Sequence, residues 1–454
     1  MNLKIEEIIN AVDGICLNPE KIGNTIIQGI YTDSRGELED GLFVPLVGEK
    51  FDGHNYIDSV YNRGAFATLS SKKEIVDDRL ITIYVEDTKM ALLHLAKYYS
   101  QLFDRPVVAI TGSVGKTTTK EMVSAVLFQS MKVHKTQGNF NNEIGVPLTL
   151  FRTQEGDGVS VIEMGMNHFG EIRNLTNAAL PDIAIITNIG TSHIENLGSR
   201  EGILKAKLEI LEGVKSNGTV IVNGDEPLLV GAKQEGWITY GLSDTNDYYA
   251  TNIVHSSVVV SATLHTPIAE YDVCIPSPGE HMVRNALAAV AVAEKLGLQK
   301  KAIIRGIASY KSAQRRMDIS IGKVTIIDDT YNASVDSMVA ALQVLENFDQ
   351  TSRKVAILGD MFELGEYSQR LHQELGNKIA TMNLDFVYTV GTDAEQINIG
   401  IDGAIPNKHY PNKQLFIEHL AENLKLHDVV LLKASRGMRF EYIVEAIGKV
   451  NYDG

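Results

Sequence analysis

The chain has 454 residues, and at about 150 residues per domain this length predicts three domains rather than one core. Hydrophobic residues make up 44% of the chain and charged residues 22%, which is typical of a folded protein and excludes a disordered one. The 57 acidic residues outnumber the 42 lysines and arginines, so the net charge of −15 argues against a nucleic acid or an anionic membrane as partner.

The cysteine content and the first residues indicate the compartment. The two cysteines, Cys16 and Cys274, are too few for a disulfide framework and have no metal-binding spacing. Glu6 and Glu7 stand where a secretion signal needs an apolar run, and no stretch approaches the roughly 20 apolar residues of a membrane span. We therefore expect a cytoplasmic protein without membrane insertion.

Residues 1–86 are predicted to form a small mixed α/β domain. Short apolar runs at residues 41–46, 65–70 and 80–85 alternate with Gly and Asp turns, and no long helical period interrupts them. These runs are expected to be strands of one sheet.

Residues 87–314 are predicted to form a central domain with a mostly parallel sheet. A helix is expected over residues 89–103, and it leads into the apolar, β-branched run 106–110, which is typical of a buried parallel strand. Further strand candidates, separated by helix-length segments, lie at residues 159–165, 183–190 and 218–225. This alternation favours a parallel sheet with crossover helices.

Residues 315–454 repeat the alternation and are predicted to form a Rossmann-like domain. The strand candidates, each followed by a helical segment, lie at residues 324–329, 355–360, 386–391 and 428–435. The fold class expected for the whole chain is therefore α/β in three domains.

The strongest chemical signal is TGSVGKTTTK, residues 111–120, between the strand at 106–110 and an amphipathic helix. Gly112 and Gly115 allow backbone N–H groups to approach phosphate oxygens, Lys116 supplies a positive charge, and Thr117 can bind Mg²⁺. The nucleotide-binding segment predicted here consists of Gly112, Ser113, Val114, Gly115, Lys116, Thr117 and Thr118.

An alternative interpretation and a departure from the general pattern both bear on whether this motif binds a phosphate. A glycine-rich turn between strand and helix is the alternative, but a turn needs neither the lysine nor the threonine. The general phosphate-loop pattern also requires glycine at position 110, where Ile110 stands. The motif is therefore predicted to bind ATP without being the standard loop of motors and GTPases.

Three further side chains are weaker candidates when taken singly. Glu163 ends an apolar strand, at the sheet edge where open α/β sheets bind ligands, and could be a metal ligand or a solvated residue. His193 also follows an apolar strand, although a lone histidine is usually structural. Lys207 lies in a helical pattern, and this pattern by itself predicts a surface lysine.

Taken together, the motifs resemble those of the Mur ligase family. The segments TGSVGKTTTKEM, GNFNNEIGVPLTL, VIEMGMNHFGEI, TNIGTSHIENLGS, LKAKLEI, GEHMVRNALAA, RRMD, DDTYNAS and LGDMFELG follow one another in the family's order. The resemblance implies an N-terminal domain that holds the UDP end of a cell-wall precursor, a central ATPase, and a C-terminal domain that brings the incoming amine.

Within the family, DSRGELEDGLFVPLVGEKFDGHNYI and LGDMFELGEYSQRLHQELG resemble the MurF type, which joins D-alanyl-D-alanine to UDP-N-acetylmuramoyl-tripeptide. The tripeptide-forming MurE type carries an Asp-Asn-Pro-Arg signature that this chain lacks. Folylpolyglutamate synthase shares the phosphate loop but begins almost directly with the ATPase. A P-loop switch or motor is a third alternative, and Ile110 argues against it.

The resemblance also implies roles for individual residues. Lys116 corresponds to the residue on the β- and γ-phosphates, and Thr117 to a ligand of a first Mg²⁺. Glu163 and His193 correspond to ligands of a second Mg²⁺, and Lys207 to a lysine that becomes carbamylated in the family. The implied cofactors are therefore ATP, two Mg²⁺ ions and a carbamylated lysine, with Lys116, His193 and Lys207 as the catalytic residues.

The remaining correspondences concern ligand contacts. Asn285 resembles the adenine contact, although a helix-surface asparagine is the alternative. Arg316 and Asp329 resemble residues that close over ATP from the C-terminal domain, or they could pair with each other. Ser34 and Arg35 resemble contacts to UDP, where an ordinary turn is the alternative. We expect a monomer with no nucleic-acid partner.

Overall fold

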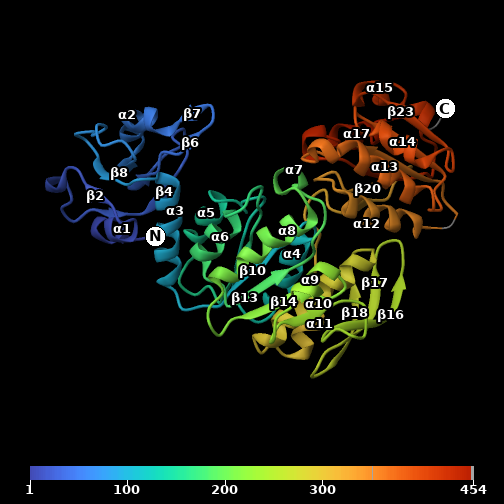
Figure 1. Ribbon diagram of the computed structural model, residues 1–454, viewed down its shortest axis with the longest axis horizontal. Helices are drawn as coiled ribbons and strands as arrows, with labels where there is room; N and C mark the ends of the chain where they lie inside the picture. Colours follow the sequence, from blue (N-terminus) through green and yellow to red (C-terminus); the bar gives the residue numbers. More distant parts are fainter. Residues whose placement is uncertain (350, 451–454) are drawn as a thin grey trace.

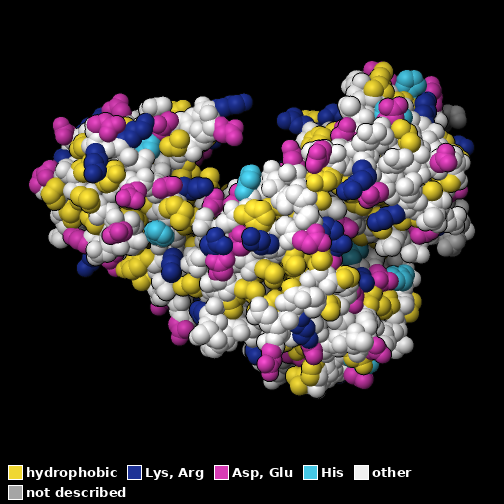
Figure 2. Space-filling model, viewed as in Figure 1, with side chains coloured by type: hydrophobic (Ala, Val, Ile, Leu, Met, Phe, Trp, Pro, Cys, Tyr) yellow, Lys and Arg dark blue, Asp and Glu magenta, His cyan; other side chains and the backbone are white. Residues whose placement is uncertain are grey.

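The computed structural model describes residues 1–349 and 351–450 and contains three successive α/β bodies (Figure 1). The N-terminal body lies at the left of the view, the central body below, and the C-terminal body at the upper right. In Figure 2 the molecular surface is deeply notched between the first and third bodies, above the central one. The α/β architecture expected from the sequence is confirmed, whereas the expected boundaries after residues 86 and 314 remain a prediction.

The N-terminal body is built on a five-stranded mixed sheet with the order β2-β9-β8-β5-β4, in which β2 is an antiparallel edge strand. Its strands are β1 (Leu3–Lys4), β2 (Ile15–Cys16), β3 (Ile26–Ile27), β4 (Gly29–Tyr31), β5 (Gly41–Phe43), β6 (Val47–Gly48), β7 (Phe51–Asp52), β8 (Ala65–Ser70) and β9 (Ile81–Tyr84). Its helices are α1 (Ile5–Ala11) and α2 (Ile57–Val60), with 3-10 turns η1 (Pro19–Lys21), η2 (Gly53–Tyr56) and η3 (Tyr61–Arg63). The three predicted apolar runs contain β5, β8 and β9.

Helix α3 (Thr88–Gln101) connects this body to the central one. It begins at Asp87, whose side chain accepts hydrogen bonds from the backbone N–H groups of Lys89 and Met90 and so satisfies two of the helix's free donors. The helix contacts α1 on one side and α5 and α6 on the other. It therefore packs against both bodies rather than acting as a free linker.

The central body contains a six-stranded parallel sheet with the order β11-β12-β10-β13-β14-β15. Its strands are β10 (Val107–Thr111), β11 (Val133–Lys135), β12 (Val159–Glu163), β13 (Ile183–Ile186), β14 (Thr219–Asn223) and β15 (Ile238–Tyr240). Its helices are α4 (Lys116–Leu127), α5 (Gly145–Leu150), α6 (Glu171–Ala179), α7 (Ile194–Leu197), α8 (Arg200–Leu208), α9 (Pro227–Ala232), α10 (Glu280–Lys295) and α11 (Lys300–Ala308), with the 3-10 turn η4 (Glu209–Gly213).

Both faces of this sheet are covered, as its continuous apolar strands predict. Val108 and Ile110 of β10 share a core with α4 and α10, whereas Val107 and Ala109 share a core with α6. Successive residues of a strand point to opposite faces, so one apolar run serves two layers of helices.

A small antiparallel sheet, β16 (Tyr249–His255), β17 (Val260–His265) and β18 (Glu270–Ile275), was not predicted. Its strands β17 and β18 alternate between buried and more exposed residues, because one face packs on the core and the other meets solvent. Such alternation is a weaker sequence signal than the continuous apolar runs that identified the parallel strands.

The C-terminal body contains a six-stranded sheet with the order β19-β20-β24-β21-β22-β23, parallel except for the edge strand β19. Its strands are β19 (Asp318–Ser320), β20 (Thr325–Asp328), β21 (Lys354–Gly359), β22 (Phe386–Val390), β23 (Asn407–Tyr410) and β24 (Val429–Lys433). Its helices are α12 (Val335–Glu346), α13 (Ser368–Ile379), α14 (Glu395–Ile401), α15 (Lys413–Glu418), α16 (Leu420–Asn423) and α17 (Glu441–Ile447), with 3-10 turns η5 (Gly365–Tyr367) and η6 (Arg436–Met438). Each of the four predicted strand runs overlaps one of its parallel strands, and β21 begins one residue before its predicted run.

A search of the helices in the described part of the chain finds none with the length and apolar character needed to cross a membrane.

Candidate active site

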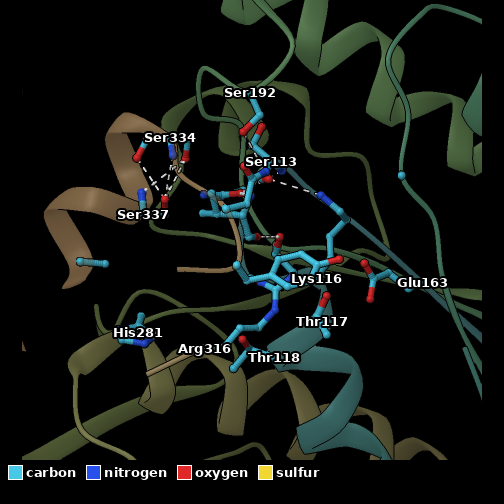
Figure 3. Close-up of a pocket in the computed structure, with 18 of the residues that line it drawn as sticks. Ser113, Lys116, Thr117, Thr118, Glu163, Ser192, His281, Arg316, Ser334 and Ser337 are labelled. Atoms are coloured by element: carbon cyan, nitrogen blue, oxygen red, sulfur yellow. Dashed lines mark hydrogen bonds between the residues drawn. The ribbon is translucent and has the colours of Figure 1, made fainter. Parts of the chain in front are cut away.

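A pocket of about 510 Å³ lies where the central body meets the C-terminal body (Figure 3). The carboxyl ends of β10 and β12, the loop after β13 and the start of α10 contribute side chains from the central body. The segments around β20 and α12 contribute the opposite wall. The pocket therefore lies at the edge of a parallel sheet where ligands of open α/β folds bind.

The predicted phosphate loop forms one side of this pocket. Gly112 and Gly115 adopt φ angles of 149° and 81°, which residues with a side chain rarely adopt. A Cβ atom at Gly112 would lie 1.8 Å from Oγ1 of Thr187, so no larger residue fits there. Ser113, Val114, Gly115, Lys116, Thr117 and Thr118 all line the pocket, as expected from the sequence.

The loop after β13 holds the phosphate loop in this shape. Oδ1 of Asn188 accepts hydrogen bonds from the backbone N–H groups of Ser113 at 3.1 Å and Val114 at 2.9 Å. The Thr187 hydroxyl donates to the Val114 carbonyl at 2.6 Å. Thr187 and Asn188 were not identified from the sequence as site residues, although both directly follow an apolar strand.

Lys116 folds back over its own loop. Its Nζ donates to the carbonyl oxygens of Gly112 at 2.7 Å and Ser113 at 3.3 Å. Burial lowers the pKa of the Lys116 ammonium, and the negative charge of Glu163 opposes this shift. The ammonium thus lies at the mouth of the loop, within the electrostatic reach of Glu163.

Glu163 is a buried carboxylate with an unused oxygen. The residue is 2% exposed, and its Oε1 accepts a hydrogen bond from Nδ2 of Asn141 at 2.8 Å. Its Oε2 has no hydrogen-bond partner and lies 3.8 Å from Nζ of Lys120. A buried carboxylate oxygen without a donor is costly, and a hard cation such as Mg²⁺ would satisfy it. The interpretation of Glu163 as a solvated residue is therefore wrong.

His193 directly precedes α7 and contacts the C-terminal body. Its Nδ1 lies 2.7 Å from Oε2 of Glu363, and both residues line the pocket. The close contact with His193 lowers the pKa of the Glu363 carboxyl, although burial opposes the shift. Glu363 belongs to the segment LGDMFELG, but the sequence did not single it out.

Lys207, on α8, is not a surface lysine as its local pattern suggested. It is 1% exposed, and among the described residues no hydrogen-bond or ion-pair partner is found for its ammonium. Burial lowers the pKa of Lys207 well below its usual value, and the positive charge of Lys116 lowers it further. The helical pattern could not reveal this, because the burial comes from elements distant in sequence.

No three His, Cys, Asp or Glu side chains within residues 1–349 and 351–450 form a ready-made metal cluster. Glu163 and His193 both line the pocket, so the two residues expected to bind the second Mg²⁺ share one cavity. Lys207 does not itself line the cavity, although it lies close enough to Lys116 for their charges to interact.

Asn285, on α10, is buried and faces α4, which excludes the helix-surface alternative. Its Oδ1 accepts a hydrogen bond from the Thr119 hydroxyl at 2.9 Å, and its Nδ2 lies 3.7 Å from Sδ of Met282. The side chain lines the pocket beside the phosphate loop. It is therefore held where a nucleotide on that loop could contact it.

The C-terminal body contributes Arg316 and Asp329, as expected. The Arg316 guanidinium lies 4.1 Å from the centre of the Tyr331 ring and extends toward the phosphate loop (Figure 3). Asp329 pairs with Lys433 and accepts a hydrogen bond from the Met317 N–H at 3.3 Å. The two residues do not pair with each other, and both line the pocket.

Ser34 and Arg35 lie in the N-terminal body, outside this pocket. The Arg35 side chain is 87% exposed and forms two hydrogen bonds with Asp33, at 2.9 Å through Nε and 2.7 Å through Nη2. Ser34 and Arg35 therefore do not share a cavity with the phosphate loop.

Models of the Mur ligase family match most of this chain. The family's catalytic domain matches residues 26–105, its middle domain residues 110–293, and its glutamate ligase domain residues 315–436. The chain is 40% identical over 450 residues to UDP-N-acetylmuramoyl-tripeptide--D-alanyl-D-alanine ligase of Bacillus subtilis, covering 97% of each.

Solved structures support the same family assignment. MurF from Acinetobacter baumannii has a TM-score of 0.93 at 32% identity, with 99% of both chains covered. MurF ligase from Thermotoga maritima in complex with ADP has a TM-score of 0.85 at 31% identity, covering 93% of this chain and 97% of that one. The sequence, the pocket and these similarities together establish that the chain belongs to the Mur ligase family and is of its MurF type.

Proposed function

We propose that this protein is an ATP-dependent ligase that joins D-alanyl-D-alanine to UDP-N-acetylmuramoyl-tripeptide in the cytoplasmic synthesis of peptidoglycan precursors. One observation carries the proposal furthest. A phosphate loop, a buried carboxylate with an unused oxygen and side chains of the C-terminal body line one pocket. This arrangement suits a reaction in which a phosphoryl group is first transferred and an amine then enters from the C-terminal body.

ATP would lie along the phosphate loop. The backbone N–H groups of the phosphate loop other than those of Ser113 and Val114, together with the start of α4, attract phosphate oxygens. Lys116, which now donates to its own loop carbonyls, would turn to the β- and γ-phosphates. Asn285, which lines the pocket, would contact the adenine, and Arg316 with Asp329 would cover the nucleotide from the C-terminal body.

Two Mg²⁺ ions fit the available ligands. The Thr117 hydroxyl would bind one ion, and the unused oxygen of Glu163 with the His193 ring would bind the second. Mg²⁺ supplies a positive charge that neutralises the transferring phosphoryl group. We propose that Lys207 joins them as a carbamate, since a buried lysine without a partner and with a lowered pKa is readily neutral and can add CO₂.

The proposed reaction has two steps. A carboxylate of the tripeptide attacks the γ-phosphorus, and ADP leaves with the bridging oxygen, so the carboxylate becomes an acyl phosphate. The amine of the dipeptide then attacks the acyl carbon, phosphate leaves, and an amide bond remains. Lys116 and Arg316 stabilise the charge on the phosphoryl oxygens, and contact between the two bodies excludes water from the acyl phosphate.

The N-terminal body is proposed to hold the UDP end of the precursor through Ser34 and Arg35. The surface notch between the first and third bodies leads from that region toward the central body, and a long substrate could span it (Figure 2). We propose that the enzyme acts as a monomer.

The test is the release of phosphate from ATP by the purified chain with the UDP-linked tripeptide, with and without D-alanyl-D-alanine. We expect release to require the dipeptide and one amide product to form for each phosphate. Release that is independent of the dipeptide would instead favour a switch or motor. A requirement for a single amino acid with a UDP-linked dipeptide would favour the MurE type, and a requirement for a folate with glutamate would favour folylpolyglutamate synthase.

A further inference from the structure

The buried carboxylate of Glu163 lies between an amide that holds it and an ammonium that does not. Its Oε1 accepts a hydrogen bond from Nδ2 of Asn141 at 2.8 Å. Its Oε2 has no hydrogen-bond partner, although Nζ of Lys120 lies 3.8 Å away. The carboxylate is therefore bound through one oxygen, while the other stops short of a direct hydrogen bond with a buried lysine.

The Asn141 amide is held in place by the chain that follows β12. The N–H of Gly165 donates to the Asn141 carbonyl at 2.8 Å, and a Cβ atom at position 165 would lie 3.1 Å from Cγ and Nδ2 of Asn141. Glycine at position 165 therefore lets the amide lie closely against the backbone. Because Asn141 belongs to the loop between β11 and α5, these contacts join that loop to the end of the strand that carries Glu163.

Lys120, on α4, is an alternative partner for the carboxylate. It is 1% exposed, and its Nζ donates to the Thr136 carbonyl at 2.9 Å and lies 3.1 Å from Oε1 of Glu121. An ammonium has three N–H donors, so these two acceptors leave one donor that could bind Oε2 of Glu163. Both charges are already buried, so a direct ion pair between them would be strong and would add little desolvation cost.

We propose that Asn141 is a positioning residue that holds Glu163 for Mg²⁺ and prevents a direct ion pair between Glu163 and Lys120. The proposal rests on the proposed function, because that function supplies the reason for a metal at Glu163. While Asn141 holds Oε1, the carboxylate stays where it lines the pocket, and Oε2 keeps its lone pairs for the ion (Figure 3). Without this hydrogen bond, rotation of the side chain toward Lys120 would withdraw the ligand from the metal.

The experiment measures metal binding rather than turnover. The full chain is saturated with a non-hydrolysable ATP analogue and titrated with Mn²⁺ in place of Mg²⁺, and free Mn²⁺ is read by electron paramagnetic resonance. Glu163→Gln identifies the bound ion that depends on this carboxylate. In Asn141→Leu, which keeps the size of the amide but has no N–H donor, we expect that ion to bind about tenfold or more weakly. The ion bound through the nucleotide phosphates should be unaffected.

Two further variants separate positioning from other effects. Lys120→Met removes the competing ammonium, so adding Asn141→Leu to this variant should weaken the ion by less than about threefold, because Glu163 then has no alternative partner. Gln137→Leu changes an exposed side chain of the same loop that does not line the pocket, and it should change the affinity less than about twofold. Circular dichroism melting of each variant checks that it is folded.

Two results of the titration overturn the proposal. Wild-type Mn²⁺ affinity in folded Asn141→Leu rejects it, as does an equal loss with and without the Lys120 ammonium, because Lys120 would then not compete for Glu163. If Lys120→Met does not fold, a crystal structure of metal-free Asn141→Leu decides. A distance of about 3.2 Å or less between Nζ of Lys120 and Oε2 of Glu163 supports the proposal, and an unchanged separation rejects it.

The titration needs neither the tripeptide nor the dipeptide. A wild type that binds Mn²⁺ as expected but shows no dipeptide-dependent phosphate release would therefore reject the proposed function and leave the role of Asn141 intact.

Discussion

At the scale of single residues, two lysines near the phosphate loop differ in burial and in hydrogen bonding: Lys116 is half-buried and Lys207 is buried. Lys116 has carbonyl oxygens of its own loop as hydrogen-bond acceptors, although burial lowers the pKa of its ammonium. Lys207 has no such acceptor among the described residues, and burial and Lys116 both disfavour its charge. Because acceptors are present for the ammonium of Lys116 and absent, within the described part of the chain, for that of Lys207, modification is more favourable at Lys207.

Replacing Lys116 by alanine should lower turnover by about 10²-fold or more, because the charge that develops on the phosphoryl oxygens would lose a positioned cation. The fold should persist, since Lys116 packs at the pocket rather than in a hydrophobic core. Lys116→Arg should recover little, because the planar guanidinium does not replace the compact ammonium within the loop. Steady-state kinetics measure the turnover of each variant, and melting curves check that it is folded. Near wild-type turnover in Lys116→Ala would reject the assignment of the phosphate loop.

Replacing Lys207 by alanine should abolish most activity, and a short carboxylic acid such as formate or acetate should restore part of it by supplying the missing anion. Lys205→Ala is the matched control, because Lys205 lies on the same helix but is exposed, and it should stay near wild-type activity. Labelling with ¹³C bicarbonate should give a carbamate signal in the wild type that Lys207→Ala lacks. Full activity of Lys207→Ala would reject the carbamate, and an inactive variant that no carboxylate restores would leave it unsupported.

At the scale of elements, the start of α10 carries a histidine whose charge the fold disfavours. Burial lowers the pKa of His281 to about 4, with the charges of Lys433 and Arg284 adding to the shift and Asp329 opposing it. Gly279, which precedes the helix with a φ of 102°, leaves no room for a side chain, since its Cβ would lie 2.5 Å from Cε1 of His281. The helix start is thus packed around a neutral imidazole.

This packing predicts a pH dependence of stability. The unfolded chain binds a proton at His281 near pH 6.5, whereas the folded chain does so only near pH 4, so the unfolding free energy falls as the pH decreases through this range. Between pH 7.5 and 6.0 the contribution is about 0.8 kcal/mol. Urea unfolding of His281→Gln should therefore show a smaller loss over this interval than the wild type. Equal losses would contradict the buried, neutral state of His281.

At the scale of the whole molecule, the residues proposed to bind the substrates are distributed over all three bodies. The phosphate loop belongs to the central body, the residues opposite it belong to the C-terminal body, and Ser34 and Arg35 lie in the N-terminal body, away from the pocket. A substrate that reaches from one end to the other must cross the surface notch seen in Figure 2. Changes in one body should therefore affect one substrate more than the others.

Arg35→Ala should raise the KM for the UDP-linked substrate about tenfold and change that for D-alanyl-D-alanine little, because an exposed guanidinium far from the pocket supplies binding rather than chemistry. Arg79→Ala, in the same body, is the control, since Arg79 is held by Asp58 and Asp77. Initial rates with each substrate varied in turn make the comparison. A larger effect on the KM of the dipeptide would reverse the assignment of the two outer bodies.

Features that depend on neighbouring residues could be read from the sequence by itself. The phosphate loop was predictable because its strand, glycines, lysine and helix are contiguous in the sequence. The parallel strands were predictable because a strand that is buried on both faces consists of an unbroken run of apolar residues. Only the tertiary structure decided the burial of Lys207, the support of the loop by Asn188 and the meeting of His193 with Glu363, which are 170 positions apart in the chain. The physical reason is that desolvation and side-chain pairing depend on which distant elements pack together, and a local pattern carries no record of that packing.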